Sequence, residues 1–335
     1  MIFVTGGTGL LGGHLLWHLL KEKEQIRAFI RSEKQKINVR NIFSVYTNEP
    51  EDYLKEIEWI EGDLLDYNSV EKAVLGSEKV YNTAAVVSYL PKRKAETIKT
   101  NILITKNLIN ACLSNGVERI CHVSSIAALG DSEDKIDEET AYDFPVNASG
   151  YSLGKYHSEL EVWRGFAEGL QGIIVNPSVI IGPGDWNRSS AALFKTVSKG
   201  LKFYTSGTTG YVDVRDVATA MIKLMQSEIN AERFLLNGEN LDYYNFLSQA
   251  AKNFDKEPPR YKAGMFASLA AAFVENLKYK ITGIEPLITR ETAVIANRKN
   301  YYNGEKITKF IPFEYTNISE SISFTCKGIK KIQNI

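Results

Sequence analysis

The chain opens on a glycine-rich run, TGGTGLLGGH at positions 5–14, flanked by two different patterns. Before it stands a short β-branched and aromatic segment (IFV, 2–4) that predicts a buried strand. After it, leucines recur at helical spacing. Such a strand, turn and helix present backbone N–H groups and a helix N-terminus to a pyrophosphate. The run therefore predicts a dinucleotide-binding turn, with Gly6 in the bend, Gly9 at the phosphates and Gly12 at the helix–strand contact.

Strand-like and helix-like segments alternate through the first half of the chain. Further strands are predicted at 25–31, 57–63, 79–87, 119–128 and 172–182. This alternation predicts an α/β fold with a doubly wound parallel sheet of the Rossmann type. Beyond the Gly-Pro-Gly break at 182–184 the pattern loosens into a smaller C-terminal lobe. We expect a dinucleotide-binding domain at 1–175, with 211–237 returning to it, and a substrate-binding lobe at 176–210 and 238–330.

Composition excludes several other classes of protein. Lys plus Arg (40) equals Asp plus Glu (40), which favours neither nucleic acid nor an anionic membrane as a partner. Three cysteines without a C-x-x-C pair, and a strand beginning at residue 2, predict a cytoplasmic protein without a signal peptide. The longest apolar stretch, 264–274, is too short to span a bilayer. We expect it to be a packing helix of the lobe rather than an amphipathic surface anchor.

A tyrosine and a lysine four residues apart, Tyr151 and Lys155, follow a strand that ends in Ser124-Ser125. On a helix the two side chains project from one face. A neighbouring ammonium lowers the pKa of a phenol from its usual value of about 10, so Tyr151 is a candidate proton donor and acceptor. A serine hydroxyl at the strand end would orient a substrate carbonyl. The alternative is an exposed helix that carries an incidental tyrosine and lysine.

Several ordered motifs together resemble the extended short-chain dehydrogenase/reductase superfamily. They are TGGTGLLG, Asp63-Leu64, NTAAVVSY, HVSSIAALG, YSLGK, NPSVIIGPGDW and YVDVRDVA, and the likeness runs from residue 1 to about 325. This NAD-dependent epimerase/dehydratase group includes nucleotide-sugar epimerases, dehydratases, dihydroflavonol reductases and 3β-hydroxysteroid dehydrogenases. The motifs are most similar to those of dihydroflavonol-reductase-like carbonyl reductases.

The resemblance assigns roles to particular residues. Tyr151 matches the catalytic acid/base, Lys155 the partner that also holds the nicotinamide ribose, and Ser125, rather than Ser124, the catalytic hydroxyl. Asn101 matches an asparagine on the helix behind the site, although a solvated helix asparagine is nearly as good an interpretation. Asp63 and Leu64 match the pair around the adenine, and Ala84 and Ala85 the small residues beneath the cofactor. The full cofactor-binding set is Gly6, Thr8, Gly9, Leu10, Leu11, Gly12, Arg31, Asp63, Leu64, Ala84, Ala85, Tyr151, Lys155, Asn176, Pro177 and Val179.

The end of the second strand bears on the choice of nicotinamide. NAD-binding proteins place an acidic residue there to bind the ribose 2′-hydroxyl, whereas this chain has Ile30 followed by Arg31. A guanidinium suits the 2′-phosphate of NADP, and Lys34 and Lys36 add positive charge. Glu33 is a carboxylate that would suit NAD instead. The sequence favours NADP and leaves NAD open.

Three features bear on the reaction. Nucleotide-sugar enzymes of the superfamily carry an arginine where this chain has Thr209, although Arg188 or Arg215 would be able to bind a diphosphate. Dehydratases carry an Asp-Glu pair where this chain has Ile126-Ala127. The substrate-side candidates beside Ser125 are aromatic and suit an apolar carbonyl compound: Tyr89, Trp186 and Phe203. We expect an oxidoreductase that reduces an aldehyde or ketone, with an epimerase, or a non-catalytic NAD(P)-binding protein, as alternatives.

Two further patterns concern metals and assembly. His14 and His18 lie four apart on a predicted helix, but no third ligand accompanies them, so no metal site is expected. Family members often dimerise through the two helices that match 94–115 and 151–168. Leu160, Trp163 and Ala167 recur at helical spacing on the second of these and would form a seam, or would face the chain's own sheet. We expect a homodimer that acts on a small molecule.

Overall fold

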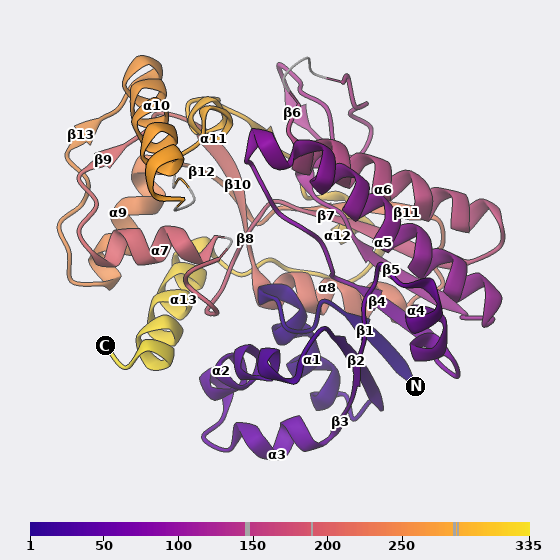
Figure 1. Ribbon diagram of the computed structural model, residues 1–335. Helices are drawn as coiled ribbons and strands as arrows, with labels where there is room; N and C mark the ends of the chain where they lie inside the picture. Colours follow the sequence, from indigo (N-terminus) through magenta and orange to yellow (C-terminus); the bar gives the residue numbers. More distant parts are fainter. Residues whose placement is uncertain (145–147, 189, 284–285, 287) are drawn as a thin grey trace.

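A computed structural model describes all residues except 145–147, 189, 284, 285 and 287. A seven-stranded sheet forms its centre, in the order β3–β2–β1–β4–β5–β7–β11 and parallel throughout (Figure 1). The strands are β1 (Ile2–Thr5), β2 (Ile26–Ile30), β3 (Ile57–Glu61), β4 (Lys79–Asn82), β5 (Arg119–Val123), β7 (Gln171–Pro177) and β11 (Glu232–Leu236). The predicted doubly wound Rossmann sheet is confirmed.

Alternate side chains of each strand enter different cores on the two faces of the sheet. On β1, Ile2 and Val4 pack into one apolar cluster and Phe3 into the other. The first cluster is covered by helices α1 (Leu10–Lys21), α2 (Lys36–Tyr46), α3 (Pro50–Lys55) and α8 (Val214–Gln226). The second is covered by α4 (Tyr67–Val74), α5 (Lys94–Ser114) and α6 (Gly150–Ala167). The sheet is thus buried on both faces. Because its strands are parallel, their carboxyl ends lie together along one edge.

The chain leaves the large sheet at Ser178. The segment 172–182, predicted as one strand, is two: β7 pairs with β11 up to Pro177, and β8 (Val179–Ile181) pairs with β10 (Thr208–Asp213). The Ser178 N–H still donates to the carbonyl of Leu236, after which the chain changes partners. A three-stranded sheet of β12 (Glu239–Asp242), β10 and β8 results, and it begins the second lobe.

Short strand pairs and helices complete the second lobe, part of which lies at the upper left of Figure 1. The strand pairs are β9 (Phe203–Tyr204) with β13 (Tyr261–Lys262), and β6 (Lys135–Ile136) with β14 (Tyr301–Tyr302). The helices are α7 (Ala191–Ser198), α9 (Tyr243–Asn253), α10 (Met265–Thr282), α11 (Arg290–Ile295), α12 (Lys306–Phe310) and α13 (Ile318–Gln333). Single-turn 3₁₀ segments lie at Glu33–Gln35, Pro91–Arg93 and Ile126–Ala128.

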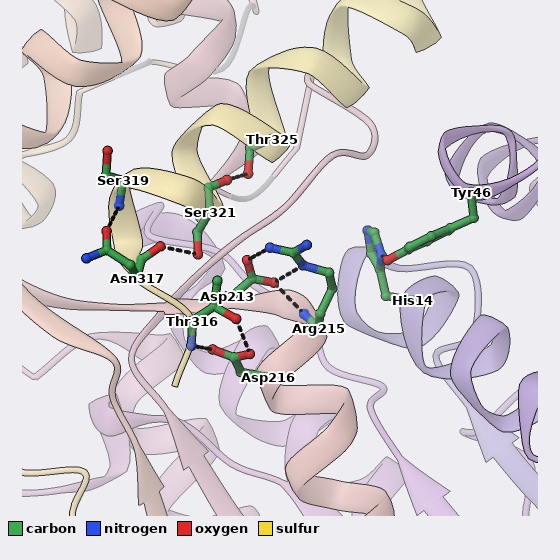
Figure 2. Close-up of polar contacts among 10 residues, drawn as sticks. All are labelled: His14, Tyr46, Asp213, Arg215, Asp216, Thr316, Asn317, Ser319, Ser321 and Thr325. Carbon is green, nitrogen blue, oxygen red and sulfur yellow. Dashed lines mark hydrogen bonds and ion pairs between the residues drawn. The ribbon is translucent and has the colours of Figure 1, made fainter. Parts of the chain in front are cut away.

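A buried polar cluster joins the two lobes where β10 runs into α8 (Figure 2). Asp213, which is fully buried, caps α8 by accepting from the Arg215 N–H at 2.7 Å, and it pairs with the Arg215 guanidinium at 2.6 Å. That guanidinium lies 4.0 Å from the centre of the Phe324 ring on α13. Asp216 accepts from the N–H and hydroxyl of Thr316, both at 2.7 Å. The C-terminal helix is therefore held to the first lobe by charge as well as by packing.

His14 belongs to the same junction and has both ring nitrogens engaged. Nδ1 lies 2.5 Å from the Tyr46 hydroxyl, and Nε2 lies 2.9 Å from the carbonyl of Pro183. Burial lowers the pKa of His14 to about 4, so the ring is neutral at physiological pH. Its role is to hold the Gly-Pro-Gly segment against α1.

Candidate active site

The glycine turn has the geometry of a dinucleotide cradle. Gly6 has a φ of +71°, and a Cβ there would lie 2.6 Å from the backbone nitrogen of Ala84. A Cβ on Gly12 would lie 2.2 Å from the carbonyl oxygen of Gly6. Gly9, at the start of α1, is exposed, and no side chain caps this helix end. Its first N–H groups are available to a pyrophosphate, so these residues fit the group that the sequence predicts.

The other predicted cofactor residues surround this turn in two ways. Thr8, Leu10, Ala84 and Ala85 are half-buried beside it, at the ends of β1 and β4. The side chains of Leu11 and Leu64 instead lie in the apolar cores, so any contact of theirs with a cofactor comes from the main chain. Asp63 is exposed and accepts from the Leu65 N–H at 3.0 Å, which fixes the turn after β3.

Ser125, Tyr151 and Lys155 come together where β5 ends and α6 begins. The Ser125 hydroxyl lies near enough to Tyr151 to lower the pKa of its phenol against the effect of burial. Ser125 Oγ also accepts from the Ala127 N–H at 3.1 Å, which fixes its rotamer. The Ser124 hydroxyl is buried and has no partner among the described residues, so Ser125 is the serine that meets the tyrosine. The predicted juxtaposition is present in the structure.

The predicted lowering of the Tyr151 pKa by Lys155 is not found. Burial raises the pKa of Tyr151, and the nearby Ser125 hydroxyl offsets only part of this change. The Lys155 ammonium donates to the carbonyl of Val123 at 2.8 Å and is buried, which lowers its own pKa to about 8. Desolvation is the largest effect on the phenol, so Tyr151 stays protonated.

A buried carboxylate lies one helical turn beyond Lys155. Glu159 raises the pKa of Lys155 against the effect of burial, and it pairs with Arg233 of β11 at 2.9 Å. It also accepts from Asn176 Nδ2 at 3.0 Å. The same Asn176 nitrogen donates to the carbonyl of Ser125, so this network holds the serine from behind. Asn176 and Pro177 are buried, and Asn176 positions the serine main chain, a role that the sequence did not indicate.

The Asn101 side chain, on α5, hydrogen bonds to the main chain of Val86. Its Oδ1 accepts from the Val86 N–H at 2.8 Å, and its Nδ2 donates to the Val86 carbonyl at 2.9 Å. Both the oxygen and the nitrogen of the Asn101 amide are therefore already hydrogen bonded to the main chain. The alternative of a solvated asparagine is wrong, because Asn101 is buried. Asn101 fixes the segment that leads from β4 to Tyr89.

Of the predicted aromatic substrate contacts, the structure brings only Tyr89 to the catalytic tyrosine. The rings of Tyr89 and Tyr151 lie 5.7 Å apart. Trp186 instead packs into the core of the second lobe beside Lys195. Phe203 lies on β9 with its ring 5.6 Å from that of Tyr261. Among the described residues, neither aromatic side chain forms a hydrogen bond or a ring contact with Ser125, Tyr151 or Lys155.

Sequence reasoning missed two residues near Tyr89. Glu291, on α11, and Tyr243, at the start of α9, both interact electrostatically with it. Ser149, the residue that caps α6, lies near enough to Glu291 to lower the pKa of that carboxyl against the effect of burial. No local pattern marks either residue, because the second lobe carries them to the site over more than ninety positions of sequence. Their positions show that α11 and the start of α9 face Tyr89.

The end of β2 leaves the predicted arginine exposed. Ile30 is buried, whereas Arg31 is exposed, and no ion pair links it to a carboxylate within the described part of the chain. Glu33, the residue that would favour NAD, pairs with Lys36 at 2.6 Å. The competing carboxylate is therefore already neutralised by a neighbouring charge.

The two arginines considered above as diphosphate ligands are both paired with carboxylates. Arg215 is held by Asp213 (Figure 2). Its guanidinium also lies over the Phe324 ring. Arg188 pairs with Asp185 at 3.5 Å on the surface. Thr209, which stands where nucleotide-sugar enzymes carry an arginine, is buried near Tyr302.

Known proteins share both sequence and fold with the chain. It is 26% identical over 329 residues to a Synechocystis protein named "Putative dihydroflavonol 4-reductase", covering 96% of this chain and 92% of that protein. It is 28% identical over 307 residues to cinnamoyl-CoA reductase 1 of Petunia hybrida, with 85% and 87% covered. The UDP-glucose 4-epimerase of Thermotoga maritima superposes with a TM-score of 0.78 at 18% identity, with 99% of both chains covered. That last likeness establishes the fold alone.

A family model extends the comparison to most of the chain. The model described as the NAD dependent epimerase/dehydratase family matches residues 2–236, which include the glycine turn, the three catalytic candidates and the whole large sheet. Reductase relatives and extended short-chain dehydrogenase/reductase structures agree with it. The chain is a member of the NAD-dependent epimerase/dehydratase family, with an NAD(P)-binding Rossmann fold of the oxidoreductase type.

Proposed function

We propose that this protein is an NADP-dependent reductase that converts an aldehyde or ketone to an alcohol. The observation that carries the proposal is the approach of Ser125 to Tyr151, whose ring lies 5.7 Å from that of Tyr89. Two hydroxyls from different elements converge on one point, and an aromatic wall stands beside them. A carbonyl oxygen placed there would accept from both hydroxyls. The complete Ser-Tyr-Lys set argues against a non-catalytic role.

Bound nicotinamide would supply the hydride, held by the glycine turn and by Lys155. The residues of this chain handle the oxygen and the proton. Ser125 orients the carbonyl oxygen, and Tyr151 donates its proton from Oη as negative charge develops there. Lys155 holds the main chain of β5 through Val123 and supplies positive charge behind the tyrosine. Tyr89 and the second lobe exclude water from an apolar substrate.

Arg31 carries the preference for NADP in this proposal. Replacing Arg31 by alanine is expected to weaken NADPH binding by about tenfold to hundredfold, because one charge-assisted contact with the 2′-phosphate is lost. NADH binding should stay nearly unchanged. Calorimetric titration of both cofactors measures this. Arg40→Ala is a matched control, because Arg40 lies on the next helix in an exposed pair with Glu51. A parent protein that binds NADH more tightly than NADPH would contradict the assignment.

A reductase and an epimerase differ in substrate and in how they treat the cofactor. With Thr209 in place of an arginine, a UDP-sugar lacks one charge-assisted pair, worth about 1.5–3 kcal/mol. We expect NADPH oxidation with at least one aromatic or aliphatic carbonyl compound, followed by absorbance, and no interconversion of UDP-glucose and UDP-galactose. A reductase also exchanges its cofactor at each turnover, so dialysis should remove it. A cofactor retained through dialysis, together with epimerisation, would support the epimerase instead.

We further infer a cytoplasmic homodimer in which residues 176–210 and 238–330 bind the substrate. The three cysteines are buried and free, which suits a reducing compartment. Leu160 and Ala167 are exposed on α6 and available to a partner. Trp163 packs against the chain's own core, so it is not a major part of the proposed seam.

A further inference from the structure

Helix α10 turns its apolar face away from the protein. Its buried residues are two small ones, Ser268 and Ala272, whereas large apolar side chains face outward. The exposed fractions are 90% for Phe266, 70% for Phe273, 62% for Val274, 51% for Leu277 and 78% for Ile281. The helix expected at 264–274 is present, but it packs through these two small residues and leaves its large apolar side chains exposed. An outward apolar face of this kind marks a site of interaction.

The spacing makes these side chains one continuous face. Positions 266, 270, 273, 277 and 281 recur at intervals of three and four, so they lie along one side of the helix. By the same periodicity, Lys278 and Lys280 lie on the two borders of that face. Lysine stems of this kind lie along apolar surface while the ammonium groups stay in a polar layer. The helix has the pattern of one that lies flat in a lipid interface.

The surrounding end of the lobe is basic in a chain whose total charge is zero. Segments 191–204 and 255–282 contain eight Lys or Arg residues and three Asp or Glu residues. Three of the lysines, Lys195, Lys199 and Lys202, line a surface hollow that ends at Phe203. Helices α7 and α10 and strands β9 and β13 gather at this end (Figure 1). Whole-chain charge balance, which excluded an anionic membrane above, conceals this local surplus.

We propose that this end of the lobe docks on an anionic lipid bilayer, with α10 lying in the interface. The apolar face enters the acyl boundary, and the surrounding lysines meet the headgroups. Phe203 and Tyr261, each 58% exposed on the neighbouring strands, add aromatic side chains of the kind found at membrane surfaces. No described helix is long and apolar enough to cross a bilayer, so the attachment would be peripheral.

Docking there would bring the bilayer beside the candidate active site. The ammonium of Lys92, three residues beyond Tyr89, lies 4.3 Å from the centre of the Tyr279 ring on α10. Helix α10 also packs against α11, which carries Glu291 to Tyr89. An apolar carbonyl substrate could then enter from the membrane. This last step rests on the proposed function, whereas the docking itself does not.

Sedimentation of the full-length protein with vesicles tests the docking without any substrate. The protein should pellet with vesicles of equal parts phosphatidylcholine and phosphatidylglycerol, and much less with phosphatidylcholine alone. Phe273→Ser with Leu277→Ser should lower the partition coefficient by about tenfold or more, because two interfacial side chains are removed. Lys278→Gln with Lys280→Gln should lower binding to the anionic vesicles only. Leu75→Ser, which changes a residue 63% exposed at the end of α4, is the matched control and should bind like the parent.

The outcomes separate the membrane from other occupants of this face. A parent protein that leaves anionic vesicles unbound, or serine variants that bind as well as the parent, would overturn the proposal. Light scattering is the second measurement. If the serine variants lower the molecular mass of the protein, the face is a contact between copies of this chain and the membrane assignment is wrong. Carbonyl reductase activity in detergent-free buffer reports separately on the proposed function.

Discussion

Replacing Tyr151 by phenylalanine is expected to lower the turnover of carbonyl reduction by about 10²–10⁴-fold, because the variant has no proton to give to the developing alkoxide. Burial raises the pKa of this tyrosine, so the parent presents the neutral hydroxyl that reduction requires. Phenylalanine keeps the ring that packs against Tyr89 and loses only the hydroxyl near Ser125. The fold and cofactor affinity should therefore survive. Steady-state kinetics and cofactor titration together measure this.

A second tyrosine on the same helix provides the control. Tyr156 follows Lys155 directly, and its ring stacks 4.5 Å from that of Tyr142, away from the serine. Tyr156→Phe should leave turnover within a few-fold of the parent. If Tyr151→Phe did the same on a substrate that the parent reduces, proton donation would have to be assigned to another group.

Replacing Lys155 by methionine is expected to abolish most activity and yet stabilise the ligand-free protein at pH 7. The folded protein lowers the pKa of this lysine from 10.5 to about 8, so the unfolded chain binds more protons between those values. Stability therefore rises with pH through that window, and below about pH 8 the buried ammonium costs on the order of 3 kcal/mol. Methionine fills similar space without charge.

Urea unfolding at pH 7 and pH 10 measures the difference. The variant should unfold at higher urea than the parent at pH 7, and the gap should narrow at pH 10 as the parent loses its buried charge. The lost hydrogen bond to Val123 acts in the other direction but contributes less, typically about 1 kcal/mol. A variant that is less stable at both pH values would mean that this bond and the pairing with Glu159 outweigh desolvation. Arg27→Met, at an ion pair with Glu58 of the outer strand β3, is a control that should show no such pH dependence.

Features that depend on neighbouring residues in the sequence were predictable. The glycine turn lies between strand and helix because each has its own periodicity, and Tyr151 and Lys155 share a face because four residues make about one turn. Contacts between segments that lie far apart in the sequence were not predictable from it. Glu291 reaches Tyr89 only through the path of the second lobe, and Ser178 changes sheets because β10 offers a partner beyond the end of β11.

Electrostatic balance was the other limit on prediction from sequence. Spacing places an ammonium near a phenol, but it does not say how much water each loses, and that loss determined the direction of the Tyr151 pKa. The exposure of the apolar face of α10 could not be predicted for a related reason. A run of apolar residues indicates a helix with an apolar face, but only the tertiary arrangement decides whether that face is covered.

The change of sheet at Ser178 has a consequence for biosynthesis. A nascent chain that has emerged only through Pro177 contains six strands of the large sheet, but helix α8 and strand β11 have not yet emerged from the ribosome. Val217, Met221 and Leu224 of that helix complete the apolar cluster over α1, so this cluster stays open to water until residue 236 is free. Translation through the intervening lobe segment thus sets how long the exposed cluster is open to chaperones and to aggregation.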